Sequence, residues 1–483
     1  MAQPKRRVLV ASNRGPVSFR FADDGTLTAR RGGGGMIAGV MSGLDALSAD
    51  TGSTWICAAL GEADRTAARE RRQTKLDGGG TVRMLDIPRD VFDAAYNEVA
   101  NSTLWFVHHM LFNTPAQPRF GAAFGRDWRA YTAYNQAFAT ALAEESRDTV
   151  DTRAVIQDYH LTLAPRLLRD LAPDTRIAHF SHTPWAPPAY FRLLPDQVAR
   201  AVLDGICGAD HAGFLAAPWA EAFLACCAEI LGAEVSRGPD GATVTHRGHV
   251  TEVAVHPLGV DVPWLRGRAA EDDVERHVAS LRQAVGDRQL IVRVDRTELS
   301  KNILGGLEAY RELLTARPQW RGRVVHLACA YPSRSAVPEY RVYTERVLTI
   351  AAEINTEFGT ADWTPLILEV KDDYARSLAA LRIADVLLIN PIRDGMNLVA
   401  QEGPVLSDRG CALVLSREAG AAALLGDDAL LINPFDLTQT ANALHEGLAM
   451  PPAERGRRAA AVVAATERRA PARWLAEQLA ALG

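Results

Sequence analysis

The chain has 483 residues, of which 48% are hydrophobic and 23% are charged, and its formal net charge is -5 at pH 7. A single hydrophobic core stops growing at about 250–300 residues, so two domains are expected. The acidic balance argues against a nucleic-acid-binding protein, which needs a basic face to neutralise phosphates. The first apolar run, Val8–Ala11, is too short for a signal peptide, and no stretch approaches the about 20 apolar residues of a membrane span. We therefore expect a cytoplasmic protein with no membrane partner.

The cysteines agree with a reducing compartment. They show no CxxC spacing and are spread along the chain at Cys57, Cys207, Cys226, Cys227, Cys329 and Cys411. Such cysteines are expected to be reduced and mostly buried.

Short apolar runs alternate with longer amphipathic stretches along the whole chain. The predicted strands of the first series are Val8–Ser12, Trp55–Leu60, Val82–Ile87, Ala154–Gln157, Ile177–Ser181, Ala212–Leu215 and Val253–Pro257. Those of the second series are Leu290–Val294, Val324–Ala328, Leu366–Val370, Val386–Asn390, Ala412–Ser416 and Leu430–Asn433. These near-continuous runs are typical of strands buried on both faces of a parallel sheet.

Helix-like stretches lie between the strands, among them Tyr134–Ser146, Pro218–Leu231, Asn302–Ala316 and an Ala/Arg-rich tail after Pro451. Repeated strand–helix units imply parallel sheets with right-handed crossovers. The charged stretch Pro263–Arg288 separates the two series and is expected to hold the domain boundary. The predicted fold class is therefore α/β, with doubly wound Rossmann-like domains at 1–262 and 263–465 that face a central cleft.

The first chemical signal is Arg14, just past the first strand, followed by the glycine run Gly32-Gly33-Gly34-Gly35. Glycines before a helical stretch let backbone amides approach a phosphate or a sugar closely, and Gly35 is expected to contact the donor substrate. A flexible surface loop is the alternative, because a glycine run alone is weak evidence.

The second signal is the segment Arg296-Thr297-Glu298-Leu299-Ser300-Lys301-Asn302, which follows a strand and opens a helix. Arg296 and Lys301 beside a helix N-terminus suit a diphosphate leaving group. Taken alone, the segment is equally compatible with a solvated helix start.

The third signal follows the strand Val386–Asn390 and runs from Pro391 to Glu402. Asp394 can hold sugar hydroxyls, and Glu402 lies inside the next helix, where it can reach a ribose diol. The amides after Gly395, at Met396, Asn397, Leu398 and Val399, are expected to form a helix N-terminus that binds a diphosphate. A capped helix with a partly exposed carboxylate is the structural alternative.

Two polar clusters end consecutive strands of the first domain. They are Asp158-Tyr159-His160 and His182-Thr183-Pro184-Trp185, and together they are suited to hold a sugar. Tyr96, Asn97, Asn101 and Trp105 form a helical group that could wall an acceptor pocket, although an aromatic stripe is more often core.

With these residues, the sequence resembles the trehalose-6-phosphate synthases, retaining glycosyltransferases with two Rossmann-like domains (the GT-B fold). The resemblance covers almost the whole chain and rests on SNRGP, YNEVANSTLW, QDYHLTLAP, HFSHTPW, HPLGVD, INTEFGTADWTPL, RDGMNLVAQE and NPFD. It implies a final helix, about Ala472–Leu482, that returns to the first domain, with 466–483 packing there.

The resemblance also implies site roles. The glucose 6-phosphate acceptor is expected to bind to Arg14, Tyr96, Trp105, Asp158 and Arg334. The donor glucose is assigned to His182 and Asp394, its diphosphate to Arg296 and Lys301, and its ribose to Glu402. Arg14 and Arg334, in opposite domains, are expected to converge on the acceptor phosphate when the cleft closes. Among these residues, Arg296, Lys301, Asp158 and His182 are expected to be catalytic.

This sequence departs from the family pattern at two places. A second tryptophan that the family often has near the strand at 55–59 is replaced by alanines such as Ala58, and RLDYSKG appears as RTELSKN. After the strand at 366–370, which in the family ends beside the nucleotide base, lie Asp372 and Asp373. A carboxylate can accept both donors of a guanine edge, so GDP-glucose is favoured over UDP-glucose. The alternative is that the two aspartates cap the following helix, Tyr374–Ala384.

No strand ends in an Asp-x-Asp pair that would hold a metal, so no metal or other cofactor is expected. The cations Arg296 and Lys301 can stabilise the leaving group in its place, in a front-face retaining transfer. Three alternatives stay open: a pseudo-glycosyltransferase resembling validoxylamine phosphate synthase, a nucleotide-sugar epimerase, and a non-catalytic sugar-phosphate sensor. A homo-oligomer is also compatible with the sequence.

Overall fold

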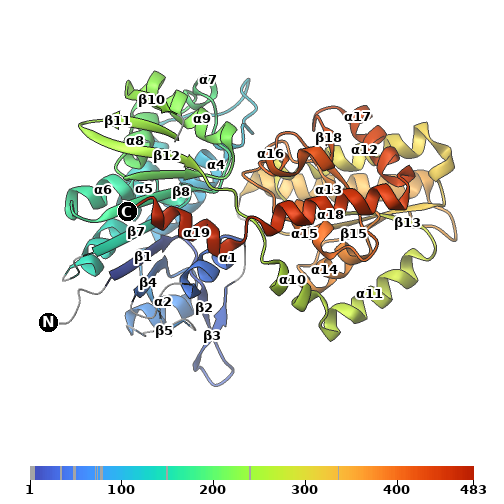
Figure 1. Ribbon diagram of the computed structural model, residues 1–483, viewed down its shortest axis with the longest axis horizontal. Helices are drawn as coiled ribbons and strands as arrows, with labels where there is room; N and C mark the ends of the chain where they lie inside the picture. Colours follow the sequence, from blue (N-terminus) through green and yellow to red (C-terminus); the bar gives the residue numbers. More distant parts are fainter. Residues whose placement is uncertain are drawn as a thin grey trace. The chain divides into compact units, whose positions relative to one another are not determined.

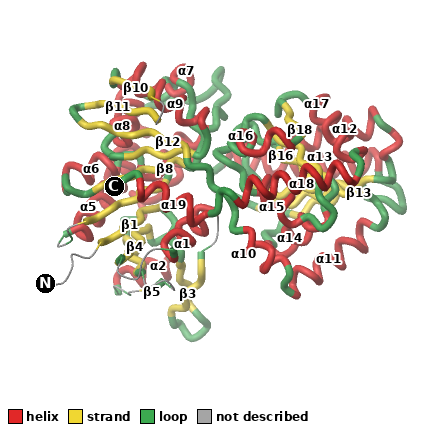
Figure 2. The backbone as a smooth tube through the Cα atoms, in the orientation of Figure 1, coloured by secondary structure: helices red, strands yellow, loops and turns green. Residues whose placement is uncertain are grey.

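The structure is a computed structural model that describes residues 6–32, 35–46, 51–70, 72, 74–76, 80–147, 149, 151–238, 241–334 and 337–483. The chain divides into two compact units, one comprising Met1–Leu258 with Pro471–Gly483 and the other Gly259–Ala470 (Figure 1). The sequence-based limits at 262/263 and 465/466 lie close to these two divisions. Figure 2 shows strands and helices combined in each unit, so the predicted α/β class is confirmed.

The first unit contains a ten-stranded sheet in the order β10-β11-β12-β9-β8-β7-β1-β4-β6-β5. Its strands are β1 Arg6–Ser12, β4 Gly52–Ala58, β5 Thr74–Lys75, β6 Thr81–Leu85, β7 Asp151–Gln157, β8 Arg176–Ser181, β9 His211–Phe214, β10 Glu234–Gly238, β11 Gly241–His246 and β12 His249–Val255. From β6 through β12 all neighbours are parallel, whereas β5, β10 and β11 pair antiparallel at the edges. The parallel strands thus run in the order 3-2-1-4-5-6-7, a doubly wound arrangement.

The helical elements of the first unit are α1 Gly35–Asp45, α2 Glu62–Arg69, α3 Arg89–Asp93, η1 Ala94–Leu104, α4 Trp105–His108, α5 Ala122–Ser146, η2 Tyr159–Leu161, α6 Ala164–Leu171, α7 Pro188–Phe191, α8 Asp196–Ile206, α9 Ala217–Cys226, η3 Cys227–Leu231 and α19 Pro471–Ala480. Elements η1 and η3 are π-helices, so the helical group around Tyr96 is wider than an α-helix. A separate hairpin pairs β2 Val17–Phe21 with β3 Leu27–Arg31.

The second unit is built on a six-stranded, wholly parallel sheet in the order β15-β14-β13-β16-β17-β18. The strands are β13 Gln289–Arg296, β14 Val324–Tyr331, β15 Leu366–Glu369, β16 Val386–Ile389, β17 Ala412–Ser416 and β18 Leu430–Ile432. In sequence order the sheet reads 3-2-1-4-5-6, which is the Rossmann arrangement. The order reverses between β13 and β16, and ligands of such sheets bind outside the carboxyl ends of the strands at that point.

The helical elements of the second unit are α10 Val262–Ala269, α11 Asp272–Val285, η4 Leu299–Lys301, α12 Ile303–Ala316, η5 Pro318–Trp320, α13 Pro338–Phe358, α14 Tyr374–Ile383, α15 Val399–Leu406, α16 Ala422–Leu425, η6 Gly426–Asp428, α17 Leu437–Ala449 and α18 Pro452–Glu467. The stretch 263–288, expected to separate the domains, instead forms α10 and α11 of this unit. Its apolar residues Val274, Val278, Leu281 and Val285 recur at helical spacing and are all buried, which explains the difference.

The last helix, α19, belongs to the first unit, as the resemblance implied. Trp474 is almost fully buried there, and its ring meets the ring of Phe180 edge-on at 4.8 Å. Gly43 of α1 permits the close approach, because a Cβ at that position would lie 2.4 Å from Cβ of Leu475. Arg153 and Arg176 of the sheet donate hydrogen bonds to carbonyl oxygens at the end of the chain.

The six cysteines are free and buried, as expected. No helix in the described part of the chain is long and apolar enough to cross a membrane.

Candidate functional site

The strand order points to one location in each unit. In the second unit the order reverses between β13 and β16, and the segments that follow these strands contain Arg296–Lys301 and Asp394. In the first unit it reverses between β1 and β7, which are followed by Arg14 and by Asp158. The residues selected from the sequence thus lie where open α/β sheets bind their ligands.

Lys301 and Asp394 form the central pair of the second unit. Lys301 Nζ lies 2.5 Å from Asp394 Oδ2, and both side chains are largely buried. Burial opposes the charge of Lys301, but the carboxylates of Asp394, Asp295 and Glu298 raise its pKa above the ordinary value. The ammonium group is therefore a fixed positive charge beside a carboxylate that can accept hydrogen bonds from sugar hydroxyls.

A buried ion pair inside β13 supports this position. Arg293 lies 2.8 Å from Asp295, and both side chains are almost inaccessible to solvent. Arg293 also donates to the backbone carbonyl of Lys301 at 3.0 Å. Burial raises the pKa of Asp295, although Arg293 and Lys301 oppose the shift. The pair fixes the turn that presents Lys301, and sequence analysis missed it although two charges inside an apolar strand were a visible signal.

A second missed residue is Glu298. Its side chain is 0% exposed, and its Oε1 lies 3.1 Å from Nη1 of Arg296, whose own side chain is 49% exposed. Ser333 Oγ donates to the same oxygen at 2.9 Å. Arg334, the next residue, donates to the hydroxyl of Tyr340 at 2.6 Å. The structure thus gathers the predicted residues Arg296 and Arg334 around a carboxylate that the sequence did not single out.

The segment after β16 differs from the expected helix start. Helix α15 begins at Val399 with Leu398 as its N-cap, so the amides of Met396 and Asn397 precede the helix. Asn397 adopts a left-handed backbone with φ of 73°, and the carbonyl of Met396 accepts from the amide of Ala421 at 2.8 Å. Asn tolerates a left-handed backbone. Because Asn397 does not have helical dihedral angles, the helix begins only after it, at Val399.

The loop that precedes α15 is tightly packed. Asn397 Nδ2 donates to Asp394 Oδ2 at 3.1 Å. Gly420 lies so close to the loop that an added Cβ would be 1.9 Å from the carbonyl oxygen of Gly395. Asp394 is thereby held by side-chain and backbone contacts in the orientation that faces Lys301.

The start of α12, expected to add its dipole to the site, is already occupied. The hydroxyl of Tyr343 accepts from the amides of Ile303 at 2.7 Å and Leu304 at 3.4 Å. These two amides already have a partner within the second unit, so the expected role of this helix N-terminus stays a prediction, whereas Arg296 and Lys301 provide charged side chains beside it.

Glu402 lies in the first turn of α15, as expected, and is half-buried. Burial raises the pKa of its carboxyl group to about 7.

Asp373 is the N-cap of α14, where its Oδ1 accepts from the amide of Arg376 at 3.0 Å, and its Oδ2 lies 3.6 Å from Nε2 of His277. The capping role weighed for this residue is thus observed, whereas Asp372 is exposed.

In the first unit, Asp158 and His182 come together as predicted, because β7 and β8 are neighbouring parallel strands. Asp158 Oδ1 accepts from the backbone amide of His182 at 3.2 Å. His182 Nε2 donates to Gln157 Oε1 at 2.7 Å. Burial, together with the nearby His179, lowers the pKa of His182 to about 3, so the ring is neutral and its protonated nitrogen is fixed.

The predicted acceptor residues lie against the same strand end. The ring of Tyr96 stacks on that of His160 at 5.6 Å, and His160 Nδ1 lies 4.0 Å from Asp158 Oδ2. Trp105 is buried, with its ring 5.6 Å from that of Tyr159. Tyr159 in turn donates to Asn101 Oδ1 at 2.9 Å. Tyr96, Trp105 and Asp158 therefore belong to one packed group.

Two buried amide groups of this first-unit group have unused donors. Nδ2 of Asn101 and Nε2 of Gln157 have no hydrogen-bond partner within the described ranges. Buried polar groups in native proteins are nearly always hydrogen-bonded, so each such exception asks for an explanation. Both atoms are shielded from solvent, so they show a buried polar environment at this strand end and do not by themselves indicate a ligand.

Arg14 follows β1 and is exposed, and its carbonyl oxygen accepts from Ser12 Oγ at 2.6 Å. Gly35 is the first residue of α1. Gly33 and Gly34 of the predicted glycine run lie outside the described residues, so the structure does not address their expected contact.

Several predicted site residues have an unusual backbone. Positive φ angles occur at Asp158 (74°), Asn302 (53°), Arg334 (45°) and Asn397 (73°), and outside the predicted site at Met110 (55°) and Arg247 (53°). Asp158, with ψ of 171°, lies in a region that is essentially reserved for glycine. Asn tolerates a left-handed backbone, whereas the conformation of Asp158 costs about 1–3 kcal/mol, and strain of this kind clusters at functional sites. The strain at Asp158 therefore supports a functional role for this residue independently of its type.

No group of three or more His, Cys, Asp or Glu side chains in the described ranges is arranged to hold a metal ion.

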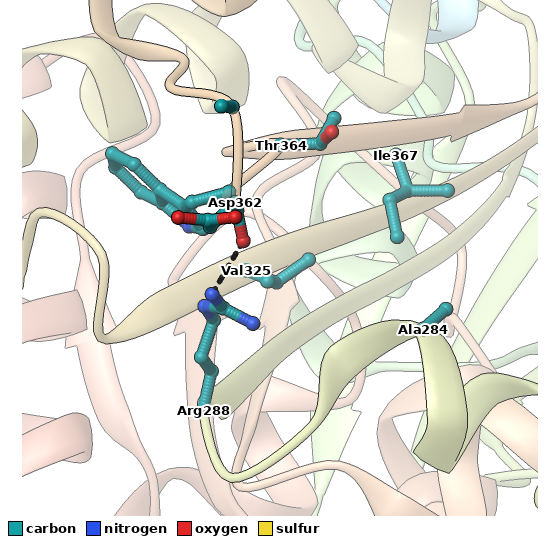
Figure 3. A pocket seen from close by; sticks show the side chains of 8 residues that line it. Ala284, Arg288, Val325, Asp362, Thr364 and Ile367 are labelled. Carbon is teal, nitrogen blue, oxygen red and sulfur yellow. Dashed lines mark hydrogen bonds between the residues drawn. The ribbon is translucent and has the colours of Figure 1, made fainter.

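A cavity of about 300 Å³ lies elsewhere in the second unit, lined by Ala284, Arg288, Val325, Ala361, Asp362, Trp363, Thr364 and Ile367 (Figure 3). It adjoins the amino-terminal halves of β14 and β15, away from the strand ends that carry Arg296. It is therefore not part of the candidate site.

Comparison with known proteins identifies the family of the chain. The family model described as Glycosyltransferase family 20 matches residues 6–483. An alpha,alpha-trehalose-phosphate synthase (UDP-forming) of Schizosaccharomyces pombe is 32% identical over 460 residues, which cover 94% of this chain and 86% of the relative. Among solved structures, one from E. coli bound with UDP-2-fluoro glucose has a TM-score of 0.85 and 28% identity, and covers 99% of this chain and 98% of its own.

A second solved structure, a UDP-forming alpha,alpha-trehalose-phosphate synthase from Burkholderia xenovorans, is in complex with glucose-6-phosphate. It has a TM-score of 0.84 and 26% identity, and it covers 99% of both chains. The family match spans nearly the whole chain, and the structural matches span both units. The chain therefore belongs to glycosyltransferase family 20, the family of the trehalose-6-phosphate synthases, and it is a retaining hexosyltransferase of that type.

Proposed function

We propose that the protein transfers glucose from UDP-glucose to glucose 6-phosphate, which forms α,α-trehalose 6-phosphate and UDP. The observation that carries this proposal is the Lys301–Asp394 pair beside Arg296 at the reversal point of the second sheet. Cations with a sugar-binding carboxylate at such a point suit a nucleotide diphosphate sugar.

In this proposal the second unit binds the donor. Arg296 and Lys301 neutralise the diphosphate, Asp394 holds glucose hydroxyls, and Glu402 accepts from the ribose hydroxyls. Backbone groups of Gly35 and of the loop from Gly395 to Val399 are proposed to complete the donor contacts. This assignment uses the charged side chains for the group on which negative charge develops.

The acceptor is assigned to Asp158, Tyr96, Trp105 and the two arginines Arg14 and Arg334. Tyr96 and Trp105 provide apolar ring surface, and the arginines provide charge for the acceptor phosphate. His182 is neutral, so it acts as a hydrogen-bonding group for the donor sugar rather than as a charge.

In the transfer, the bond from the glucose anomeric carbon to the diphosphate oxygen breaks. The acceptor hydroxyl oxygen forms its bond to the same face of that carbon, and its proton passes to the departing diphosphate. Lys301 and Arg296 stabilise the negative charge that develops on the leaving group, so catalysis consists mainly of positioning and electrostatic stabilisation.

The donor base is the part of this proposal that departs from the sequence-based expectation. The sequence favours GDP-glucose through Asp372 or Asp373, but in the structure Asp373 caps helix α14. The relatives named above are UDP-forming, and an E. coli structure of similar fold is bound with a UDP sugar. These observations do not support a preference for GDP-glucose, so UDP-glucose is the donor proposed here.

The test is incubation of the purified protein with glucose 6-phosphate and UDP-glucose. UDP should be released only when both substrates are present, together with a non-reducing disaccharide phosphate. An epimerised nucleotide sugar, or binding without turnover, would overturn the proposal. Transfer only to a cyclitol phosphate would favour the pseudo-glycosyltransferase alternative.

A further inference from the structure

Glu298 is a buried carboxylate in the segment after β13. Its side chain is fully inaccessible, yet it lies 3.1 Å from Arg296 and accepts a hydrogen bond from Ser333 at 2.9 Å. Its Oε2 has no hydrogen-bond partner within the described residues. Burial of a charge costs several kcal/mol unless cations compensate it. The compensation at Glu298 comes from the cations to which phosphate binding is assigned above.

The charge state of Glu298 is fixed by these neighbours. Burial alone would raise the pKa of its carboxyl group, but Arg296, Arg334 and Lys301 together lower that pKa to about 2. Glu298 is therefore ionised at any pH at which the protein works. A permanent negative charge among three cations reduces their mutual repulsion and holds them close together.

The two arginines come from neighbouring strand ends. Arg296 is the last residue of β13 and is paired in register with Tyr331, the last residue of β14, and Arg334 follows three positions later. Glu298 contacts both loops, through Arg296 on one side and Ser333 on the other. Arg334 also has a left-handed backbone with φ of 45°, so its position depends on its surroundings.

We propose that Glu298 is a positioning residue that orients Arg296 and Arg334 together, so that one buried carboxylate prepares the phosphate contacts of both substrates. This inference rests on the proposed function, in which Arg296 binds the donor diphosphate and Arg334 the acceptor phosphate. Without the carboxylate, both guanidinium groups would have to be ordered at the moment of binding, which weakens binding and transition-state stabilisation.

The first variant is Glu298→Gln, which keeps the shape and the Ser333 contact but removes the charge. We expect kcat/KM to fall at least about tenfold for UDP-glucose and also for glucose 6-phosphate, since hydrogen bonds to charged groups are involved. Glu298→Asp keeps the charge and should restore part of the loss. A fall confined to one substrate, or a lower melting temperature with both kcat/KM values unchanged, would overturn the proposal.

A double-mutant cycle distinguishes positioning from a general structural role. In an Arg296→Ala background, Glu298→Gln should cause no further loss in donor kcat/KM. In an Arg334→Ala background it should cause no further loss in acceptor kcat/KM. Losses that multiply in both backgrounds would contradict an action through the arginines.

The same double-mutant cycles can be measured without turnover, from the dissociation constants of UDP and of glucose 6-phosphate determined by calorimetry. If Glu298→Gln does not fold, Glu298→Asp is carried through the cycles with the same expectations. The native protein is assayed first: absence of transfer there would contradict the proposed function. Transfer with multiplicative losses would contradict only the role of Glu298.

Discussion

At the scale of single residues, the candidate site depends on pairs of opposite charge at partly buried positions. Lys301 Nζ and Asp394 Oδ2 are 2.5 Å apart, and Arg293 holds the backbone of Lys301 by donating a hydrogen bond to its carbonyl oxygen. Such a preorganised cation needs no rearrangement when negative charge develops on a leaving group. Its removal should therefore affect the rate more than the fold.

Lys301→Ala is expected to lower kcat by a factor on the order of 10²–10³, the usual cost of removing one preorganised charge donor. Lys301→Arg, which keeps the charge but changes its shape, is the matched control and should lose less. Steady-state kinetics and a melting curve are the measurements. Turnover close to that of the native protein in Lys301→Ala would show that the assigned role is wrong.

Glu402 predicts a pH dependence. Because burial raises its pKa to about 7, the carboxyl group is protonated in the folded protein at mildly acidic pH. The ionised form is the one that accepts from both ribose hydroxyls, so donor KM should rise as pH falls from about 8 to about 6. Glu402→Gln should have a high donor KM that lacks this dependence.

The raised pKa of Glu402 also makes the stability of the fold depend on pH, in a direction that can be predicted. A carboxyl group with a raised pKa in the folded state stabilises the fold below its unfolded pKa, and this contribution is lost as pH rises through about 7. Glu402→Gln should therefore melt higher than the native protein at alkaline pH, with the difference shrinking in acid. A constant difference at all pH values would contradict the raised pKa.

At the scale of elements, the contact between α1 and α19 ties the end of the chain to the first unit. Gly43 is placed so that any Cβ would meet Leu475 at 2.4 Å, and Trp474 of the same helix is buried against Phe180. The ring centroids of His182 and Trp474 are 5.6 Å apart. The contact between α1 and α19 therefore also supports His182, which is proposed to hold the donor sugar.

Gly43→Ala should destabilise the protein by about 1–3 kcal/mol, because it overpacks a close helix contact. Adding Leu475→Ala should recover part of that loss, which denaturant unfolding can measure. Gly125→Ala in α5 is the control: its Cβ would meet nothing within 4 Å, so it should be neutral or stabilising by up to about 1 kcal/mol. If both alanine variants lose the same stability, close packing at Gly43 is not the reason.

The burial of an element decides whether it could be predicted from the sequence. Each strand predicted from a continuous apolar run coincides with an observed strand, because such runs are buried on both faces. The missed strands are mainly exposed: β3 reads LTARR and β10 reads EVSRG, and both are almost entirely accessible. Their pairing is decided by neighbours in the fold, which local composition does not reveal.

The same distinction applies to the site. Lys301, Asp394, Asp158 and His182 could be selected because each follows a recognisable strand, and parallel strands bring their ends together. Glu298 could not be ranked in this way, since its importance comes from Ser333 and Arg334 on a different loop. The contact at the α12 start could not be predicted for a related reason, because the hydroxyl that accepts from the amide of Ile303 comes from Tyr343 on another helix.

At the scale of the whole molecule, the two units share one plan, with the sheet order reversing after the first strand of each. In the proposed function the nucleotide sugar binds to the unit that carries Lys301, and the base of the nucleotide is then the part that distinguishes one donor from another. We expect kcat/KM to be at least about tenfold higher for UDP-glucose than for GDP-glucose, and Asp372→Asn to leave that ratio nearly unchanged. A preference for GDP-glucose that Asp372→Asn abolishes would instead restore the base contact first expected from the sequence.

The central claim is retaining transfer of glucose to glucose 6-phosphate, and the structure of the product tests it most directly. The native protein is incubated with glucose 6-phosphate and UDP-glucose labelled with ¹³C at the anomeric carbon, and the product is examined by NMR. The account predicts a non-reducing disaccharide phosphate in which both anomeric centres are α. A β configuration at the labelled carbon, a product that keeps a reducing end, or label that never leaves the nucleotide would contradict it.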